Sequence, residues 1–509
     1  MKKSVALLAL LATGCMSLEP HLAKPDPAIP PSWPVGDAYL VQFETGLPTV
    51  TYKQIFIDPR LQTLVAQALA NNRDMMIAAA NIDAARERYL IQRAQQLPQV
   101  DAGAGVTLSG NRSSGSSNSG NGNGNGSGSG SSGGSGGSSG VRANYSAGIS
   151  VPSFEIDLFG RLRSLTRAQL EQYFATEAGA RATRLTLVAN IANAWLDYAS
   201  DTSLLLIAEQ TAAAAQKSVR LTRLRLEGGI APRTDLSQAE QILDQAQADL
   251  ANQKTLVAQD VNALQLLVGE PINANLLPAS IDEAATSIQQ LPAGVSSDVL
   301  LRRPDVVQAE YQLRSANADI GAARAALFPR ITLTGLLGFA SSALGSLFTG
   351  GSFGWQAGAN AAYTIFQAGA GHANVRLTEA QRNAALATYQ RAVQTAFREV
   401  ADALARRGTM DEQLAATQRR QAAAADVATL EEARYREGID SYLNFLDAQR
   451  SYYTVQQVLV QTKLTAAQNR VALYSALGGD ALLQNAPVCD VAYVSSASSA
   501  KLASQCSPM

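Results

Sequence analysis

The sequence predicts an α+β membrane protein built from two tandem copies of one unit, each with a helix, a β-hairpin and a very long helix. Three observations support this fold class. Landmark residues recur in the second half of the chain at matching distances, four segments alternate apolar and polar residues, and two stretches of more than sixty residues lack proline. Together they predict four β-strands and two unusually long helices per chain.

The composition excludes several classes of function. The 509 residues contain 41 Lys and Arg against 42 Asp and Glu, so no excess of positive charge points to nucleic acid as a partner. The two histidines and three cysteines are not clustered as a metal or catalytic site requires. No phosphate-binding loop, nucleophile elbow or paired-carboxylate arrangement stands out. We therefore expect no enzyme activity, no catalytic residue and no metal or other bound cofactor.

Residues 1–14 have the form of a secretory signal peptide. Lys2 and Lys3 precede an apolar stretch at 5–12 that is too short to cross a bilayer. The stretch runs into Leu11-Ala12-Thr13-Gly14-Cys15, which resembles a bacterial lipoprotein box although the leucine stands one place early. Cys15 would then carry a covalent lipid, and several acyl chains on one cysteine anchor a protein firmly.

The residue after the cysteine bears on the destination of the chain. Met16 stands where lipoproteins retained at the inner membrane tend to have aspartate, which favours the outer membrane. An ordinary signal peptide followed by a chance cysteine is the alternative. With the lipid in place, residues 15–57 form a proline-rich leader.

Internal repeats define two copies, residues 58–270 and 289–478, followed by a tail at 479–509. Gly229 and Gly438 are 209 residues apart, as are Gly269 and Gly478. Nearer the start of each copy the distance is 231 residues, from Asp74 to Asp305 and from Pro98 to Pro329, so the first copy contains about 22 extra residues. Residues 109–140 supply them, because every position there except Arg112 is Gly, Ser or Asn. Such a segment cannot bury a core and reads as a flexible loop.

The strand pattern is clear on both sides of this loop. Residues 141–151 and 100–108 alternate apolar and polar side chains, and residues 331–339 and 355–363 are the candidate strands of the second copy. Each copy thus contributes one hairpin. Segments of about ten alternating residues suit a tilted membrane strand, while a soluble β-subdomain with one apolar face is the alternative. Four strands alone cannot close a barrel, so their edges need partners from other chains.

Two very long helices follow the strands. Residues 161–227 and 370–437 contain no proline and are rich in Ala, Leu, Arg and Gln. At about 1.5 Å per residue, each extends about 100 Å, which exceeds an ordinary globular helix and is typical of coiled-coil packing. Glycine-centred turns end them, and shorter helices follow at 234–268 and 441–477. Proline at 59 and 304 marks the first turn of a helix near the start of each copy.

These features, with Leu301-Arg302-Arg303-Pro304-Asp305 and Leu327-Phe328-Pro329, resemble the TolC-like outer-membrane factors. More closely, they resemble the lipoprotein branch that serves resistance-nodulation-division efflux pumps, over about residues 15 to 480. The resemblance implies a homotrimer whose twelve-stranded barrel in the outer membrane of a Gram-negative bacterium continues as an α-helical periplasmic tunnel. It also implies a passive exit duct for small molecules such as drugs, with a periplasmic adaptor and an inner-membrane transporter as partners.

The resemblance further implies a gate at the turn glycines, Gly229 and Gly438. Thr234 and Asp235 match positions that hydrogen-bond the neighbouring helix pair, although either residue could simply cap its helix. Tyr435 matches a tyrosine that restrains the closed state, with ordinary interhelical packing as the alternative. Asp447 matches an aspartate that points into the lumen and forms an acidic ring by symmetry, unless it is merely solvated.

Two departures from the family pattern affect the gate. Asn444 stands where some members have a second aspartate, and Asp440 stands where some have the arginine that locks the gate. We expect a charge pair between Arg434 and Asp235 to close the gate in place of that arginine.

Other side chains support only lesser alternatives. Cys489 and Cys506 in the tail are a possible disulfide pair in an oxidising compartment. His21 and His372 are isolated, and the adjacent Met75-Met76 diverge on a helix, so export of heavy-metal cations is a minor alternative. A structural or adhesive coiled-coil lipoprotein, with the strands as a soluble head, is the main alternative from another class.

Overall fold

The computed structural model describes residues 17–23, 29–30, 33–34, 36, 38–39, 51–110, 141–290 and 297–479. The predictions for Cys15, most of the 109–140 loop, Cys489 and Cys506 lie outside these residues and stay predictions. The chain divides into two compact units. Unit 1 comprises Met1–His21, Arg88–Gln169 and Asn317–Ala380, and unit 2 comprises Leu22–Glu87, Leu170–Ala316 and Gln381–Met509.

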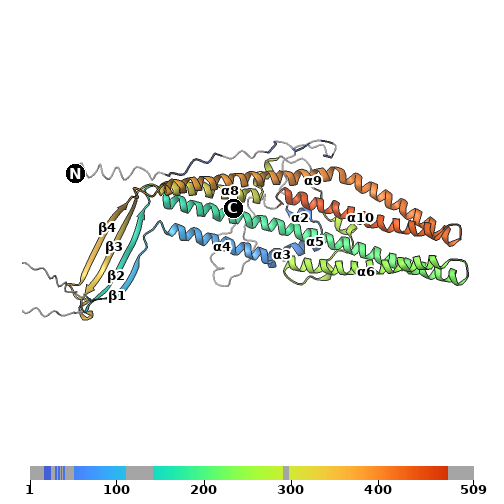
Figure 1. Ribbon diagram of the computed structural model, residues 1–509, viewed down its shortest axis with the longest axis horizontal. Helices are drawn as coiled ribbons and strands as arrows, with labels where there is room; N and C mark the ends of the chain where they lie inside the picture. The colour runs from blue at the N-terminus through green and yellow to red at the C-terminus, as the bar shows by residue number, and fades with distance from the viewer. Residues whose placement is uncertain are drawn as a thin grey trace, which may run out of the picture. The chain divides into compact units, whose positions relative to one another are not determined.

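Unit 1 contains one four-stranded antiparallel sheet. The strands lie side by side in chain order (Figure 1), as β1 (Asp101–Gly110), β2 (Val141–Ile156), β3 (Arg330–Ser341) and β4 (Phe353–Ala362). β1 pairs with β2 and β3 with β4, which confirms one hairpin from each copy. β2 also pairs with β3, so the two hairpins form a single sheet.

The β2–β3 pairing depends on two facing glycines. A Cβ atom at Gly148 would lie 2.7 Å from the Leu337 carbonyl oxygen, and one at Gly338 would lie 2.6 Å from that of Ala147. Further along β2 the register shifts between Val151 and Phe154. Pro152 lies in that bulge, where its missing N–H removes no ladder hydrogen bond.

The sheet leaves apolar side chains uncovered in a single chain. Leu336 and Leu337 on β3 are 52% and 50% exposed, and because they are consecutive they point to opposite faces. Trp355 on β4 is 74% exposed. Strands β1 and β4 are the two edges and have no further strand partner among the described residues.

The helices have the predicted extents, with differences of one residue at their ends. The first long helix is α5 (Arg161–Glu227) and the second is α9 (Ala370–Arg436), followed by α6 (Arg233–Val268) and α10 (Tyr442–Ala476) respectively. None of the helices in the described residues carries an apolar stretch long enough to cross a membrane. The remaining helices are α2 (Tyr52–Ile55), α3 (Pro59–Asn71), α4 (Arg73–Ala94), η1 (Ala274–Leu276), α7 (Ile281–Thr286), η2 (Ser297–Arg302), α8 (Pro304–Ala325) and η3 (Leu344–Ser346).

The core of unit 2 packs around α5. Trp195 is fully buried and donates its indole N–H to the Leu276 carbonyl oxygen at 3.1 Å. Phe56 packs edge-on against Tyr474 of α10, with ring centroids 5.7 Å apart, and pairs through its backbone with Ile288. The segments between and before the repeats, including the short α2 and α7, therefore help to build the same core.

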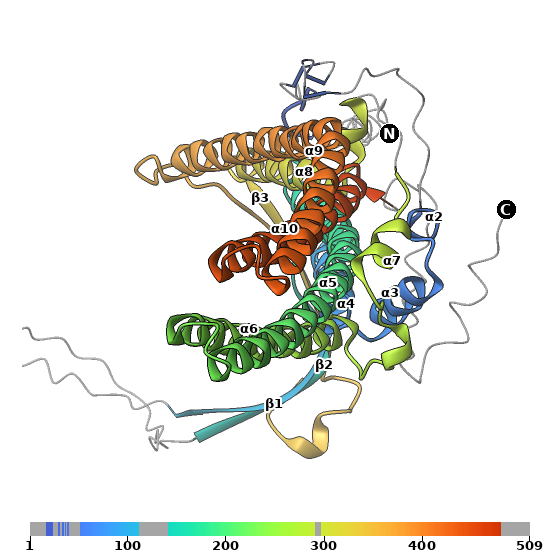
Figure 2. The ribbon, with the colours of Figure 1, turned by 90° about the vertical axis from the view of Figure 1, so that its right-hand side faces the viewer.

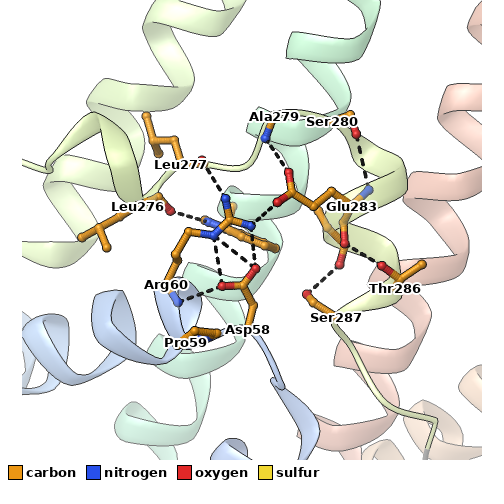
Figure 3. A network of polar contacts seen from close by, with 12 residues as sticks. Asp58, Pro59, Arg60, Leu276, Leu277, Ala279, Ser280, Glu283, Thr286 and Ser287 are labelled. Atoms are coloured by element: carbon orange, nitrogen blue, oxygen red, sulfur yellow. Dashed lines mark hydrogen bonds and ion pairs between the residues drawn. The ribbon is translucent and has the colours of Figure 1, made fainter.

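A polar network fixes the start of α3 to the segment that contains α7 (Figure 3). Asp58 caps α3 by accepting the Arg60 N–H at 2.8 Å, and the proline predicted in the first turn follows it. The Arg60 guanidinium pairs with Asp58 at 2.7 Å and with Glu283 at 2.6 Å, and donates to the Leu277 carbonyl oxygen at 3.4 Å. One arginine thus joins segments more than 200 residues apart in sequence.

Arg303 plays the corresponding role at the start of α8. Its buried guanidinium pairs with Asp305 at 2.9 Å and with Glu399 of α9 at 2.8 Å, and donates to the Ala476 carbonyl oxygen of α10 at 2.8 Å. A buried cation is tolerated only with partners such as these. The Arg303-Pro304-Asp305 motif therefore ties together three helices of the second copy.

Candidate functional site

Two helical turns in unit 2 form the candidate site. Turn 1 (residues 228–232) joins α5 to α6, and turn 2 (residues 437–441) joins α9 to α10. Figure 1 shows both turns at the same end of the unit, and Figure 2 looks at that end. Hairpin 1 is defined as α5 with α6, and hairpin 2 as α9 with α10.

The two turns have the same backbone geometry. Gly229 and Gly438 have φ angles of +71° and +78°, which glycine adopts at little cost. In turn 1 the Gly229 N–H donates to Leu226 O at 3.0 Å and the Ile230 N–H to Arg225 O at 2.8 Å. Turn 2 repeats both bonds 209 residues later, at 3.0 and 2.9 Å. This is a Schellman motif, which satisfies the last carbonyl groups of each long helix.

Beneath the turns lies a small apolar cluster that joins the two hairpins. Tyr435 is only 4% exposed, and its ring stacks on that of Phe445 with centroids 5.4 Å apart and planes 5° from parallel. The ring centroids of Tyr442 and Tyr435 are 5.3 Å apart. The Tyr442 hydroxyl shares a hydrogen bond of 3.1 Å with the Ser218 hydroxyl of hairpin 1. Burial raises the pKa of the Tyr442 hydroxyl. The cluster also contains Val219, Ala239, Leu446, Leu236, Ile242 and Leu243.

Arg225 crosses from hairpin 1 to hairpin 2. Its guanidinium carbon lies 4.6 Å from the centroid of the Tyr435 ring, and its Nη1 donates to the Tyr435 carbonyl oxygen at 3.1 Å. A cation–π interaction of this kind contributes about 0.5 to 2 kcal/mol to the stability of the contact, and the contribution is larger when the pair is shielded from water. Sequence reasoning missed Arg225, Ser218 and Phe445.

The side chains of turn 2 are held within hairpin 2. Arg434 pairs with Asp440 at 3.1 Å and lies 3.8 Å from Glu431. The Asp440 carboxylate also accepts the Ser441 N–H at 2.8 Å and the Asn444 side chain at 2.6 Å. These hydrogen bonds, with Arg434 beside them, hold the pKa of the Asp440 carboxyl below its usual value. Within the described residues Arg434 makes its ion pairs with these two acids and not with Asp235.

Thr234 and Asp235 do not cap α6. The helix begins at Arg233, and Pro232 stands at the cap position without a side-chain hydrogen bond. Thr234 and Asp235 are therefore the second and third residues of the helix. At that position the negative charge of the Asp235 carboxylate interacts favourably with the positive end of the helix dipole and stabilises the helix. The alternative that Thr234 or Asp235 caps the helix is wrong. Pro232 occupies the cap position with an extended backbone, and both residues lie inside the helix.

Asp447 lies on the exposed face of α10. Tyr442, Phe445 and Leu446 point into the cluster and are buried, whereas Asn444 and Asp447 are exposed. Residues three apart lie on the same side of a helix, so Asn444 and Asp447 share one face. Asp447 makes no ion pair within the described part of the chain, which leaves its carboxylate available to solvent or to passing ions.

Among the described residues, no group of three or more His, Cys, Asp or Glu side chains is placed to hold a metal ion. Met75 is buried in the core of unit 2, so it is not part of an accessible thioether site.

Comparisons with known proteins agree on one family. The profile described as outer membrane efflux protein matches residues 64–270 and 295–479, so each matched segment contains one of the two turns. TtgC of Pseudomonas putida, a probable efflux pump outer membrane protein, is 40% identical over 479 residues, covering 94% of this chain and 95% of TtgC. The outer membrane protein OprJ of Pseudomonas aeruginosa is 36% identical over 474 residues, covering 93% and 95%.

A solved structure has the same fold. The open state of the MtrE outer membrane channel of Neisseria gonorrhoeae matches with a TM-score of 0.77 at 31% identity. The match covers 91% of this chain and 98% of the MtrE chain.

Proposed function

The chain belongs to the outer membrane efflux protein family, and from this membership we propose that three copies form a passive, gated exit duct for small molecules. The protein is the outer-membrane channel of an efflux pump, as its relatives are. The observation that carries the proposal is the sheet of unit 1. Among the described residues its edge strands β1 and β4 each have a strand partner on one side only, and exposed apolar side chains such as Leu337 and Trp355 lie on one of its faces. A sheet of this kind needs neighbours and an apolar surrounding.

Assembly supplies both. When β4 of one copy pairs with β1 of the next, three copies close a twelve-stranded barrel that has no free edge. The long helices α5 and α9 then continue the duct as an α-helical tunnel into the periplasm. Leu337 of β3 and Trp355 of β4 are direct cross-strand partners, so they share one face of the sheet, and their exposure fits a face that meets lipid. The opposite face, with Thr332 and Thr334 on β3, would then line the duct.

Energy for transport comes from partners. The sequence has no nucleotide-binding motif, so an inner-membrane transporter of the resistance-nodulation-division class drives export, and a periplasmic adaptor connects it to the duct. The turns offer a surface for the adaptor, because Ile230 and Ile439 are 73% and 68% exposed at their tips. Drugs and other small molecules are the proposed cargo.

The two turns form the gate of the duct. Three copies of Asp447 line the opening as an acidic ring that favours cations, and Asn444 on the same face makes the ring less acidic than two aspartates would. A closing contact between Arg434 and Asp235, which lie on different hairpins, would have to replace the pair that Arg434 makes with Asp440.

The leader anchors the duct through a lipid on Cys15. Four residues later Glu19 is held in unit 1, where Arg167 pairs with it at 3.4 Å and Asn317 donates to the Pro20 carbonyl oxygen at 2.9 Å. A Cβ atom at Gly321 would lie 3.1 Å from the Glu19 Cα atom, so glycine permits this close approach. The leader is thus fixed to the folded chain close to the proposed lipid.

Membrane fractionation of the native full-length protein tests the proposal. We expect a trimer in the outer-membrane fraction that resists mild heating and is extracted only by detergent. A barrel is embedded in the bilayer, so neither lipase treatment nor high salt should release it. Release by either treatment alone would contradict the duct and favour a lipid-anchored adhesive or structural coiled coil.

A further inference from the structure

The structure shows an unequal use of two equivalent arginines. Arg225 and Arg434 are 209 residues apart, the same distance that separates the turn glycines, so each arginine occupies the same place in its copy. Arg434 is paired within its own hairpin by Asp440. The position equivalent to Asp440 in the first copy is Ala231, which has no carboxylate. Arg225 therefore lacks that acid and reaches across to Tyr435 instead.

Tyr435 receives Arg225 through its ring and its backbone. The guanidinium carbon lies 4.6 Å from the ring centroid, and the backbone carbonyl accepts the hydrogen bond at 3.1 Å. The Tyr435 hydroxyl oxygen, in contrast, is buried and has no hydrogen-bond partner among the described residues. The contact between the hairpins thus uses the aromatic ring and the main chain, and makes no use of the hydroxyl group.

We propose that Arg225 is the latch that holds hairpin 1 to hairpin 2 and keeps the gate closed, by binding the ring and carbonyl of Tyr435. This inference rests on the proposed function as a gated duct. Opening moves the hairpins apart at the turns, and the guanidinium then leaves the ring. The latch acts within each chain, so a trimer carries three of them. Arg225 is available for this role because residue 231 is alanine, whereas the equivalent position in the second copy is Asp440.

Single-channel recordings of the full-length trimer in planar bilayers test the latch. Arg225→Gln removes the cation while keeping a polar side chain, and we expect a several-fold rise in mean conductance. Arg223→Gln is the matched control, because Arg223 lies two residues away on the same helix and pairs with Glu240 of its own hairpin at 2.9 Å. This control should conduct as the wild type does.

Two substitutions of Tyr435 separate its ring from its hydroxyl. Tyr435→Phe keeps the ring and should leave the conductance at the wild-type level. Tyr435→Leu removes the ring but keeps the backbone carbonyl, and should raise the conductance toward that of Arg225→Gln. The double variant Arg225→Gln/Tyr435→Leu should conduct no more than Arg225→Gln alone, because loss of the guanidinium already removes its contact with the ring. If Arg225→Gln fails to form a heat-resistant trimer, Arg225→Met, which keeps the aliphatic stem, replaces it with the same expected rise.

Each outcome has a defined meaning. Wild-type conductance in Arg225→Gln or Arg225→Met overturns the latch, as does a Tyr435→Phe variant that opens as widely as Tyr435→Leu. Neither result affects the duct itself, since the channel still conducts. The proposed function fails on a different observation, a verified trimer that gives no channels at all.

Discussion

Replacing Asp447 with alanine is expected to remove most of the preference for cations over anions that the proposed acidic ring gives the channel. Asp447 is exposed on α10, makes no ion pair among the described residues and shares its face with the uncharged Asn444. In the proposed trimer three such carboxylates would surround one opening. The Coulomb energy between one such carboxylate and an ion about 4 Å away is about 1 to 4 kcal/mol, depending on the local dielectric. A loss of that size changes the relative permeability of cations and anions several-fold.

The measurement is the reversal potential of single channels in a planar bilayer under a salt gradient. Asp447→Glu keeps the charge and should retain cation preference. Asp244→Ala, which removes an exposed carboxylate from α6, is the control for a general change in surface charge. An Asp447→Ala channel with the wild-type reversal potential would eliminate the acidic ring.

Gly269→Ala is expected to destabilise the folded chain considerably more than the same substitution at the turn glycine Gly229. Gly269 ends α6 with a φ of +81°, which costs alanine about 1 to 2 kcal/mol. An added Cβ atom would also lie 2.6 Å from the Asn71 carbonyl oxygen, which belongs to the backbone and cannot rotate away. Overpacking of this kind adds about 1 to 3 kcal/mol.

Gly229→Ala provides a matched control for this prediction. Its φ of +71° imposes a similar backbone cost, but a Cβ atom there would meet nothing within 4 Å. The midpoint temperatures of dissociation and of unfolding, measured on the purified trimer, should therefore fall much further for Gly269→Ala than for Gly229→Ala. Equal losses would show that the contact with Asn71 is relaxed at no cost.

Much of the architecture could be predicted because its signals are local. The absence of proline from 161 to 227, followed by a glycine pair, predicted α5 with both ends correct. The alternating segments predicted all four strands. The pairing of β2 with β3 could not be predicted, because the two strands come from different copies and nothing in either sequence specifies the register. The short α2 and α7 were missed because helices of four to six residues show no periodic pattern.

The candidate site was predictable in part for the same reason. The turn glycines have local signals, and the structure gives both of them the left-handed backbone that a helix end requires. The contact of Arg225 with Tyr435 joins residues 210 apart, although the equivalence of Arg225 and Arg434 in the repeat was a signal that could have led to it. The electrostatic environment of single side chains could not be predicted from the sequence either. Burial and neighbouring carboxylates raise the pKa of Asp260 to about 7, and both causes depend on the fold.

The conductance of the wild-type trimer in a planar bilayer, with no nucleotide, proton gradient or partner protein present, tests the central claim most directly. A passive duct is expected to give stepwise single-channel currents that increase with salt concentration and change sign with the applied voltage. A correctly assembled trimer that gives no current steps under these conditions would contradict the account.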